Sequence, residues 1–262
     1  MSLVLKNIGL TINGKTLIEN INLTVTPGEV LAILGPNGAG KSTVFKVMAG
    51  EYRHFSGAMT INGQTYQGYS SNRRAKMIGV LPQSSELAFP FSAYEVVMLG
   101  RLPHSTGRKK DHQIAVAAMQ QLDVLKLADA LYPALSGGEK QRVQLARVLC
   151  QIWQAANANL DAENRYLLLD EPTSALDLSH QHQTLSLARE LAASGMGVLC
   201  ILHDLNLAAQ YADKILMLSA GKVMSQGSVS EVLTSERIAR LYGIDVTVIP
   251  HPKHNHPLVI TG

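Results

Sequence analysis

The chain has 262 residues, of which 46% are hydrophobic, 5% aromatic and 16% charged, and its formal net charge is +3. This length is enough for one large domain or a domain with an inserted subdomain, and so weak a charge gives no support for a nucleic-acid-binding protein. The sequence opens without a signal peptide and contains no apolar run near the roughly 20 residues of a membrane helix, so we expect a cytoplasmic protein that reaches a membrane only through a partner.

The first 63 residues predict a small antiparallel sheet. Apolar and polar residues alternate from Leu3 to Ile12, an Asn13-Gly14 turn follows, and a second run extends from Leu17 to Val25. This pattern is typical of a β-hairpin. The segment Gly57–Ile61, followed by another Asn-Gly turn, is expected to join the same sheet.

Short, wholly apolar runs recur later in the chain and predict a parallel α/β sheet. Such runs are typical of strands that are buried on both faces. They are Val30–Leu34, Met77–Leu81, Tyr166–Leu169 and Val198–Leu202. Between Ser84 and about Asn159 no such run occurs, which predicts an inserted helical subdomain hinged near Pro82-Gln83. The Pro- and His-rich tail, with His251, His254 and His256, is expected to be a flexible, solvated loop, although its histidines also suggest a metal or heme ligand.

A phosphate-binding loop is predicted directly after the first apolar run, in the sequence GPNGAGKS. The glycines let backbone N–H groups surround the phosphates, Lys41 reaches the β- and γ-phosphates, and the Ser42 hydroxyl can bind Mg²⁺. The alternative is a glycine-rich turn with an exposed lysine. The predicted ATP-binding residues are Gly35, Pro36, Asn37, Gly38, Ala39, Gly40, Lys41, Ser42 and Thr43.

Polar residues at the ends of three other predicted strands complete a hydrolytic site. Asp170 ends YLLLD and is expected to bind Mg²⁺, while Glu171 is the candidate general base for the attacking water. His203 follows VLCIL and is a candidate sensor of the γ-phosphate, because ligands of open α/β sheets bind at this edge. Gln83 can meet Mg²⁺ or the attacking water, although spacing alone leaves a structural role equally open.

A second anion site is predicted at LSGGE. Ser136 can cap a helix, and Gly137 and Gly138 would let a phosphate approach the free backbone N–H groups at its start. A capping box of Ser136 with Glu139 explains the same residues without a ligand. If the helix binds phosphate, two copies of the chain can enclose two ATP molecules, each between the P-loop of one copy and the glycines of the other.

The motifs together resemble the ATP-binding-cassette (ABC) ATPases along nearly the whole chain. GPNGAGKS is similar to their Walker A motif, LLLDEP to Walker B, and LSGGE to the signature motif, with Gln83 at the Q-loop and His203 at the H-switch. The resemblance implies a head-to-tail homodimer and a D-loop containing Ser174 and Asp177. The usual adenine-stacking aromatic is replaced by Ile12, so no residue is assigned to the adenine.

The resemblance also implies the fold: a P-loop NTPase (RecA-like) core with an N-terminal antiparallel β-subdomain and an inserted α-helical subdomain. The core and β-subdomain would comprise residues 1–83 and 160–250, the helical subdomain 84–159, and the tail 251–262. Bound ATP and Mg²⁺ are implied as cofactors, with Mg²⁺ held by Ser42, Gln83 and Asp170. Glu171, His203 and Gln83 would be the catalytic residues.

A finer resemblance concerns the transported substrate. LGRLPH is similar to ATPases of iron-chelate, cobalamin and heme importers, and the insertion IWQAANANLDAENR resembles the hemin-import ATP-binding proteins. It implies a homodimeric polytopic permease as partner, a periplasmic heme-binding protein acting indirectly, no nucleic acid, and a position on the cytoplasmic face of the inner membrane. Residues 89–99 would either line a groove for a permease helix or pack as helical core.

Three alternatives to a heme-import ATPase remain open at this level. Cobalamin or ferric-siderophore importers share most of the motifs. A non-transport ABC ATPase of translation or DNA repair usually has tandem cassettes or long coiled-coil insertions, which are missing from this sequence. A monomeric P-loop kinase of small metabolites would not need the residues of LSGGE.

Overall fold

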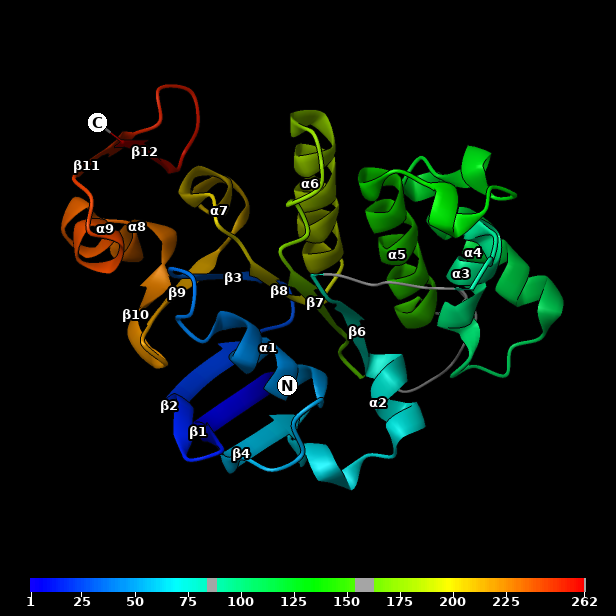
Figure 1. Cartoon of the computed structure of the whole chain (residues 1–262), viewed down its shortest axis with the longest axis horizontal. Helices are drawn as coiled ribbons and strands as arrows, with labels where there is room; N and C mark the ends of the chain where they lie inside the picture. Colours follow the sequence, from blue (N-terminus) through cyan, green and yellow to red (C-terminus); the bar gives the residue numbers. More distant parts are fainter. Residues whose placement is uncertain (84–88, 154–162, 262) are drawn as a thin grey trace.

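The computed structural model describes residues 1–83, 89–153 and 163–261, which form two main sheets, a terminal hairpin and surrounding helices (Figure 1). The sheets have the strand orders β2-β1-β4-β5, β10-β9-β3-β8-β7-β6 and β11-β12. The strands are β1 (Leu3–Ile12), β2 (Lys15–Val25), β3 (Val30–Leu34), β4 (Ser56–Ile61), β5 (Gln64–Thr65), β6 (Ile78–Leu81), β7 (Tyr166–Asp170), β8 (Gly197–Ile201), β9 (Lys214–Ser219), β10 (Lys222–Ser228), β11 (Val246–Pro250) and β12 (Pro257–Thr261).

The helices lie on both faces of the six-stranded sheet and beyond its β6 edge (Figure 1). The α-helices are α1 (Lys41–Ala49), α2 (Ser71–Met77), α3 (Ala93–Met98), α4 (Arg108–Gln121), α5 (Gly137–Ile152), α6 (Leu178–Ala193), α7 (Leu205–Tyr211), α8 (Val229–Val232) and α9 (Ser235–Tyr242). Short 3₁₀ helices are η1 (Tyr66–Gly68), η2 (Leu99–Arg101), η3 (Leu125–Leu127) and η4 (Tyr132–Ala134).

The N-terminal antiparallel sheet is confirmed. β1 pairs antiparallel with β2, with Leu3 opposite Val25, and with β4, with Leu3 opposite Ile61. Leu3, Leu5 and other alternate residues of β1 are buried, because successive side chains of a strand point to opposite faces.

The parallel sheet is also confirmed. β9, β3, β8, β7 and β6 run parallel to their neighbours, and β10 is an antiparallel edge strand. Met77 ends helix α2 rather than starting β6. The pattern analysis did not predict β9 and β10, which extend the sheet beyond β3.

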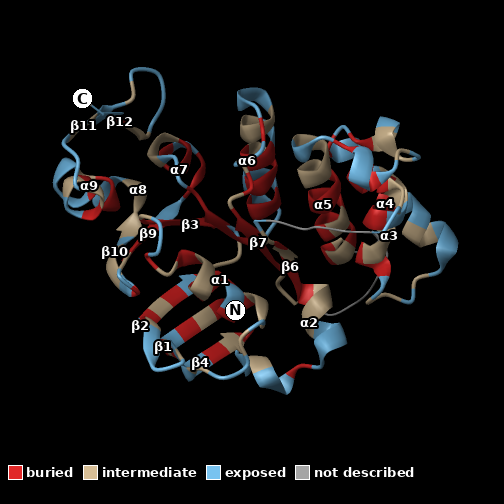
Figure 2. Cartoon of the chain, in the orientation of Figure 1, coloured by how far each residue is buried: buried red, intermediate tan, exposed pale blue. Residues whose placement is uncertain are grey.

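Two hydrophobic clusters sandwich the six-stranded sheet (Figure 2). Ala32 and Leu34 of β3 point into the cluster that contains α5, α6 and α7, whereas Leu31 and Ile33 point into the cluster that contains α1 and the antiparallel sheet. All five residues of β3 are buried. A strand covered on both faces can have an unbroken apolar sequence, which is the pattern seen in VLAIL.

Residues 89–153 are mainly helical, as predicted, with an isolated bridge between Ser92 and Leu131 in addition. The LGRLPH stretch joins these helices: the buried Arg101 guanidinium donates to the carbonyls of Cys150 and Trp153 and to Asp111. The predicted boundaries after residues 83 and 159 lie beside or within segments outside the described residues, as does most of the predicted insertion, so they stay predictions.

Some residues between 89 and 99 are buried in the core, and others are exposed at the surface. Ala93, Val96 and Val97 are buried, as expected of plain helical core. Phe89 is 68% exposed, and the groove for a permease helix stays a prediction.

The prediction of a flexible, solvated tail is wrong for its last residues. β12 pairs with β11, and Val259 is buried. The Asn206 side chain on α7 donates to the Val259 carbonyl at 3.0 Å and accepts from its N–H at 2.8 Å. Prolines at both ends of HPKHNHP hid the strand pattern in the sequence, because proline signals a turn or a break. The three tail histidines lie together in the hairpin loop, with ring centroids 4.6–5.7 Å apart. They belong to no metal-binding cluster among the residues that the structure describes.

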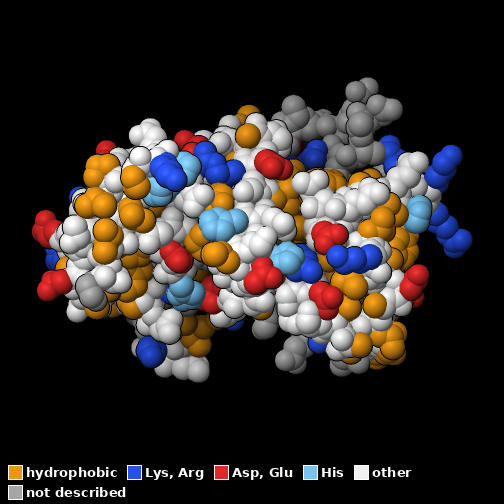
Figure 3. Space-filling view, turned by 90° about the horizontal axis from the view of Figure 1, so that it is seen from above, with side chains coloured by type: hydrophobic (Ala, Val, Ile, Leu, Met, Phe, Trp, Pro, Cys, Tyr) orange, Lys and Arg blue, Asp and Glu red, His pale blue; other side chains and the backbone are white. Residues whose placement is uncertain are grey.

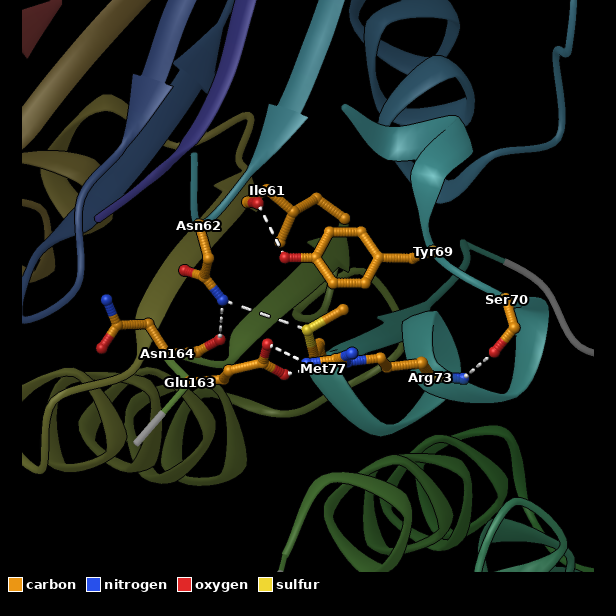
Figure 4. A network of polar contacts seen from close by, with 8 residues as sticks. All are labelled: Ile61, Asn62, Tyr69, Ser70, Arg73, Met77, Glu163 and Asn164. Carbon is orange, nitrogen blue, oxygen red and sulfur yellow. Dashed lines mark hydrogen bonds and ion pairs between the residues drawn. The ribbon is translucent and has the colours of Figure 1, made fainter. Parts of the chain in front are cut away.

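A polar network joins the antiparallel sheet to α2 and to the start of β7 (Figure 4). The Asn62 side chain donates to the Asn164 carbonyl at 3.1 Å and accepts from the Tyr166 hydroxyl at 2.7 Å. Arg73 forms an ion pair with Glu163 at 2.5 Å. These contacts fix the chain where it enters β7, the strand that carries Asp170.

The molecular surface mixes charges of both signs. Figure 3 shows lysines, arginines, acidic residues and histidines side by side on one face. No helix within residues 1–83, 89–153 and 163–261 is both long and apolar enough to cross a bilayer. Cys150 and Cys200 are buried free thiols.

Candidate active site

The P-loop connects β3 to the start of helix α1. Gly40 precedes α1 in a left-handed conformation, with φ of 101°, and caps it without a side-chain hydrogen bond. A Cβ at Gly40 would lie 2.9 Å from Ile18 Cγ2, and a Cβ at Gly35 would lie 2.4 Å from the Leu218 carbonyl oxygen. Glycine is therefore required at both positions, and the backbone N–H groups at the start of α1 are left for an anion.

Lys41 is buried at the first position of α1, with 5% of its surface exposed. Its Nζ donates to the carbonyl of Gly35 at 2.7 Å and to that of Pro36 at 3.0 Å, so the amine is held across the loop. Burial lowers the pKa of Lys41, and the nearby carboxylates of Glu171 and Asp170 oppose that shift. The structure thus brings the predicted phosphate-binding lysine to both predicted carboxylates.

Asp170 ends β7 and is also buried, with 4% of its surface exposed. Burial raises the pKa of Asp170 to about 6, the neighbouring Glu171 adds to the increase, and Lys41 opposes it. Its Oδ1 is buried without a hydrogen-bond partner among the described residues. A buried carboxylate oxygen without a donor fits a hard cation such as Mg²⁺ or a water bound to it.

Glu171 lies between two of the other predicted catalytic residues. Gln83 Nε2 donates to Glu171 Oε2 at 2.7 Å, and His203 Nε2 lies 2.5 Å from Glu171 Oε1. The backbone of Glu171 is left-handed, with φ of 50°. The structure therefore gathers Gln83, Glu171 and His203, from three loops at the carboxyl ends of β6, β7 and β8, into one cluster.

The loop after Glu171 contains the two predicted D-loop residues. The Ser174 backbone N–H and hydroxyl both donate to the Glu171 carbonyl, at 3.2 and 3.1 Å. Asp177 is the N-cap of α6 and accepts from the His180 N–H at 2.9 Å. Ser174 thus supports the Glu171 backbone, while Asp177 is held by a helix end.

The signature residues lie at the start of helix α5. The capping box is present: Ser136 Oγ accepts from the Glu139 N–H at 3.4 Å and donates to the Glu139 carboxylate at 2.7 Å. Ser136 and Gly137 are nevertheless exposed. A Cβ at Gly138 would lie 3.3 Å from the Ala175 carbonyl oxygen, so these glycines face the D-loop of their own chain. The cap and an exposed anion site are compatible in this geometry.

One expectation, at Ile12, and one contact that the sequence did not predict, at Gln141, also concern this site. Ile12 ends β1 and packs partly buried against the antiparallel-sheet core, so the adenine contact stays unassigned. Gln141 was not singled out from the sequence, although its Nε2 donates to the Glu171 carbonyl at 3.4 Å. Its position one helical turn after Gly137 was the available signal, because residues four apart share a helix face.

Comparisons with known proteins identify the family of the chain. The ABC transporter family model matches residues 18–174. The hemin import ATP-binding protein HmuV of Gloeobacter violaceus is 51% identical over 97% of this chain and 91% of its own length. HmuV of Photobacterium damselae subsp. damselae is 44% identical over 99% of this chain and 96% of its own length.

Solved structures give the same result for the fold. One chain, from an inward-facing ABC transporter assigned to the metal-chelate type, superposes with a TM-score of 0.80 and 28% identity, covering 100% of this chain and 97% of the other. The ATP-binding cassette MJ1267 in its ADP conformation has a TM-score of 0.77 and 21% identity, covering 92% and 98%. Sequence, fold and site geometry together place this chain in the ABC transporter family, as an ATP-binding subunit.

Proposed function

We propose that this chain is the ATP-hydrolysing subunit of a membrane importer of heme. The observation that carries the proposal is 44–51% identity, over nearly the whole chain, to proteins named as hemin import ATP-binding proteins. The Glu171 cluster supports the hydrolytic part, because it places a carboxylate, an amide and an imidazole at the carboxyl edge of a parallel sheet.

ATP binds through the P-loop residues 35–43 in this proposal. Backbone N–H groups at the start of α1 hold the phosphates. The Lys41 amine gives up its hydrogen bonds to the Gly35 and Pro36 carbonyls and donates to phosphate oxygens instead. Asp170, Ser42 and the Gln83 side-chain carbonyl would hold Mg²⁺, which would supply positive charge against the β- and γ-phosphates. The unpartnered Oδ1 of Asp170 supports this assignment.

Glu171 accepts a proton from the attacking water in the proposed reaction. The water oxygen bonds to the γ-phosphorus as the bond to the bridging oxygen of ADP breaks, and the water proton moves to the carboxylate. Gln83 orients Glu171 through Oε2. His203 Nε2 lies next to Glu171 Oε1, and it can donate to the γ-phosphate instead when nucleotide is bound.

Hydrolysis requires a second copy of the chain in this proposal. Ser136, Gly137 and Gly138 of one copy bind the γ-phosphate held by the P-loop of the other, and Ser174 and Asp177 line the shared interface. Ser136 and Gly137 are exposed at the start of α5, which supports an intermolecular role. Removal of the γ-phosphate then opens the dimer, as expected of a ligand that binds one of two states more tightly.

The ATPase acts on the cytoplasmic face of the inner membrane by docking on a homodimeric permease. A cleft of about 580 Å³ lies between the end of α1, α2, β6 and α5, and it offers room for a permease helix. Its lining includes Tyr52, Arg53, Phe55, Tyr66, Arg74 and Gln151, and it contains no residue of the stretch 89–99 that the sequence suggested for this groove. A periplasmic heme-binding protein would deliver the substrate to the permease, and no nucleic acid takes part.

Reconstitution of the ATPase with its permease in vesicles tests the substrate. We expect ATP-dependent uptake of heme, and no uptake with Glu171→Gln, because hydrolysis drives the cycle. Cobalamin and a ferric siderophore serve as competing substrates in the same vesicles. Preferential uptake of either would contradict the heme assignment while leaving the transport ATPase intact.

A further inference from the structure

We propose that Gln141 is a positioning residue for Glu171, through which helix α5 acts on the hydrolytic site of its own chain. The inference rests on the proposed function, because it assumes that Glu171 is the general base and that the start of α5 binds a nucleotide. It adds a connection between these two sites within one chain.

Gln141 lies on α5 and contacts the loop that carries Glu171, as a connection between the two sites requires. It follows Gly137 by one helical turn, and its Nε2 donates to the Glu171 carbonyl at 3.4 Å. Ser174, within the loop itself, donates to the same carbonyl through its N–H and its hydroxyl. Of these two residues, only Gln141 belongs to the helix that begins with the signature glycines.

The backbone of Glu171 needs such support. Its φ of 50° is in the left-handed region, which costs a non-glycine residue free energy and persists only when the surroundings hold it. The Glu171 N–H is held by the Ile201 carbonyl at 3.2 Å, so the carbonyl side is the one that α5 can influence. Relaxation of this backbone would turn the carboxylate away from Gln83 and His203.

A small cavity lies at this junction. It has a volume of about 170 Å³ and is lined by residues of α5, the D-loop and the end of β6. Gln83, Gln141 and Ser174, which all contact Glu171, line it together with Gly137 and Lys140. A shift of α5 would therefore change the cavity and the support of Glu171 at the same time.

The side-chain carbonyl oxygen of Gln141 is not satisfied in the way that its N–H group is. Its Oε1 is buried without a hydrogen-bond partner among the described residues. Such groups are rare in folded proteins and mark positions where another requirement outweighs local satisfaction. Here the Gln141 amide donates to the carbonyl of the left-handed residue Glu171, while its own oxygen accepts no hydrogen bond from a described residue.

Steady-state and single-turnover ATPase kinetics of Gln141→Leu in the full chain test the inference. We expect kcat to fall by about three- to tenfold, the effect of one hydrogen bond, while KM for ATP changes by less than about twofold. Gln141→Lys, which keeps an N–H donor, should retain most of the activity. In a Glu171→Gln background, Gln141→Leu should cause no further loss, because the group it positions has already been replaced.

Gln120→Leu is the control, since it makes the same replacement at an exposed position of α4. Unchanged kcat for Gln141→Leu, an equal loss in both backgrounds, or a loss in KM alone would overturn the inference. If Gln141→Leu does not fold, Gln141→Met gives the same comparison. Full turnover by Glu171→Gln alone would instead remove the proposed base, which separates failure of the function from failure of this inference.

Discussion

At the scale of single residues, the site places two adjacent carboxylates in different surroundings. Asp170 is buried next to Lys41 and lacks a donor on Oδ1, whereas both oxygens of Glu171 face polar side chains. Asp170 is the last residue of β7, and Glu171 follows it with a left-handed backbone. One acid is thus suited to bind a cation and the other to accept a proton.

The buried acid should destabilise the nucleotide-free protein at neutral pH. Burial raises the pKa of Asp170 from 3.8 to about 6, so the protonated form stabilises the fold fully below pH 3.8, and this contribution is lost as the pH rises through 6. We expect Asp170→Asn to increase the free energy of unfolding at pH 8 by about 1–2 kcal/mol, with the gain disappearing toward pH 4. Urea unfolding without nucleotide or Mg²⁺ measures both values.

Asp177→Asn provides the control with the opposite sign. The N–H of His180 lowers the pKa of Asp177, so its contribution is present above its ordinary pKa and is lost as the pH falls. Replacement of Asp177 should therefore give no stabilisation at pH 8. The same gain in both variants would contradict the assignment to burial.

At the scale of elements, the observed cap at the start of α5 and the anion site proposed there can be separated. Ser136 and Glu139 cap the helix, and Gly137 leaves its first turn open, since the nearest atom to a Cβ there is Ala175 Cβ at 3.9 Å. A side chain at Gly137 is thus tolerated by the isolated fold. In the proposed dimer, the bound anion is what requires the space.

Gly137→Asp distinguishes folding from ligand binding. A carboxylate in the first helical turn favours the helix dipole, so stability should be unchanged or higher by about 0.3–1 kcal/mol. The same charge repels a phosphate, so ATPase activity should fall by at least about tenfold. Thermal unfolding and ATPase assays of one preparation measure both effects, with Gly137→Ala as the uncharged comparison. Normal ATPase activity of Gly137→Asp would leave the capping box as the whole explanation of LSGGE.

At the scale of the whole molecule, the P-loop and signature residues of one chain serve different nucleotides in the proposed dimer. Ser136 and Gly137 are exposed, and Gly138 packs against the D-loop of its own chain. A second copy would supply the missing wall of each site. Association should therefore depend on both nucleotide and Gly137.

Sedimentation of Glu171→Gln tests this dependence. With Mg²⁺ and ATP it should form a dimer, because slow hydrolysis preserves the γ-phosphate that bridges the copies. Without nucleotide it should be monomeric. The double variant Gly137→Asp/Glu171→Gln should stay monomeric under both conditions, and its dimerisation with ATP would rule out the signature contact.

Local patterns determined much of this protein before the structure was known. Asn-Gly turns with alternating residues predict the β1–β2 hairpin, and apolar runs that end in glycine or acid predict β3 and β7, because the signals lie within a few residues. Gly35, Gly40 and Lys41 are recognisable for the same reason. The rule that ligands bind at the carboxyl edge of a parallel sheet singled out His203, whereas for Gln83 it left a structural role equally open until the family resemblance placed this residue at the Q-loop.

Only the tertiary structure decided what depends on contacts between distant segments. The Asn206–Val259 contact joins residues 53 apart and makes a strand of a tail that the sequence predicts as a solvated loop. The Gln141–Glu171 contact joins residues 30 apart, and the left-handed backbone of Glu171 follows from such support. Sequence patterns record local conformational preference, whereas the energies of burial and of hydrogen bonding between distant segments exist only once these segments meet.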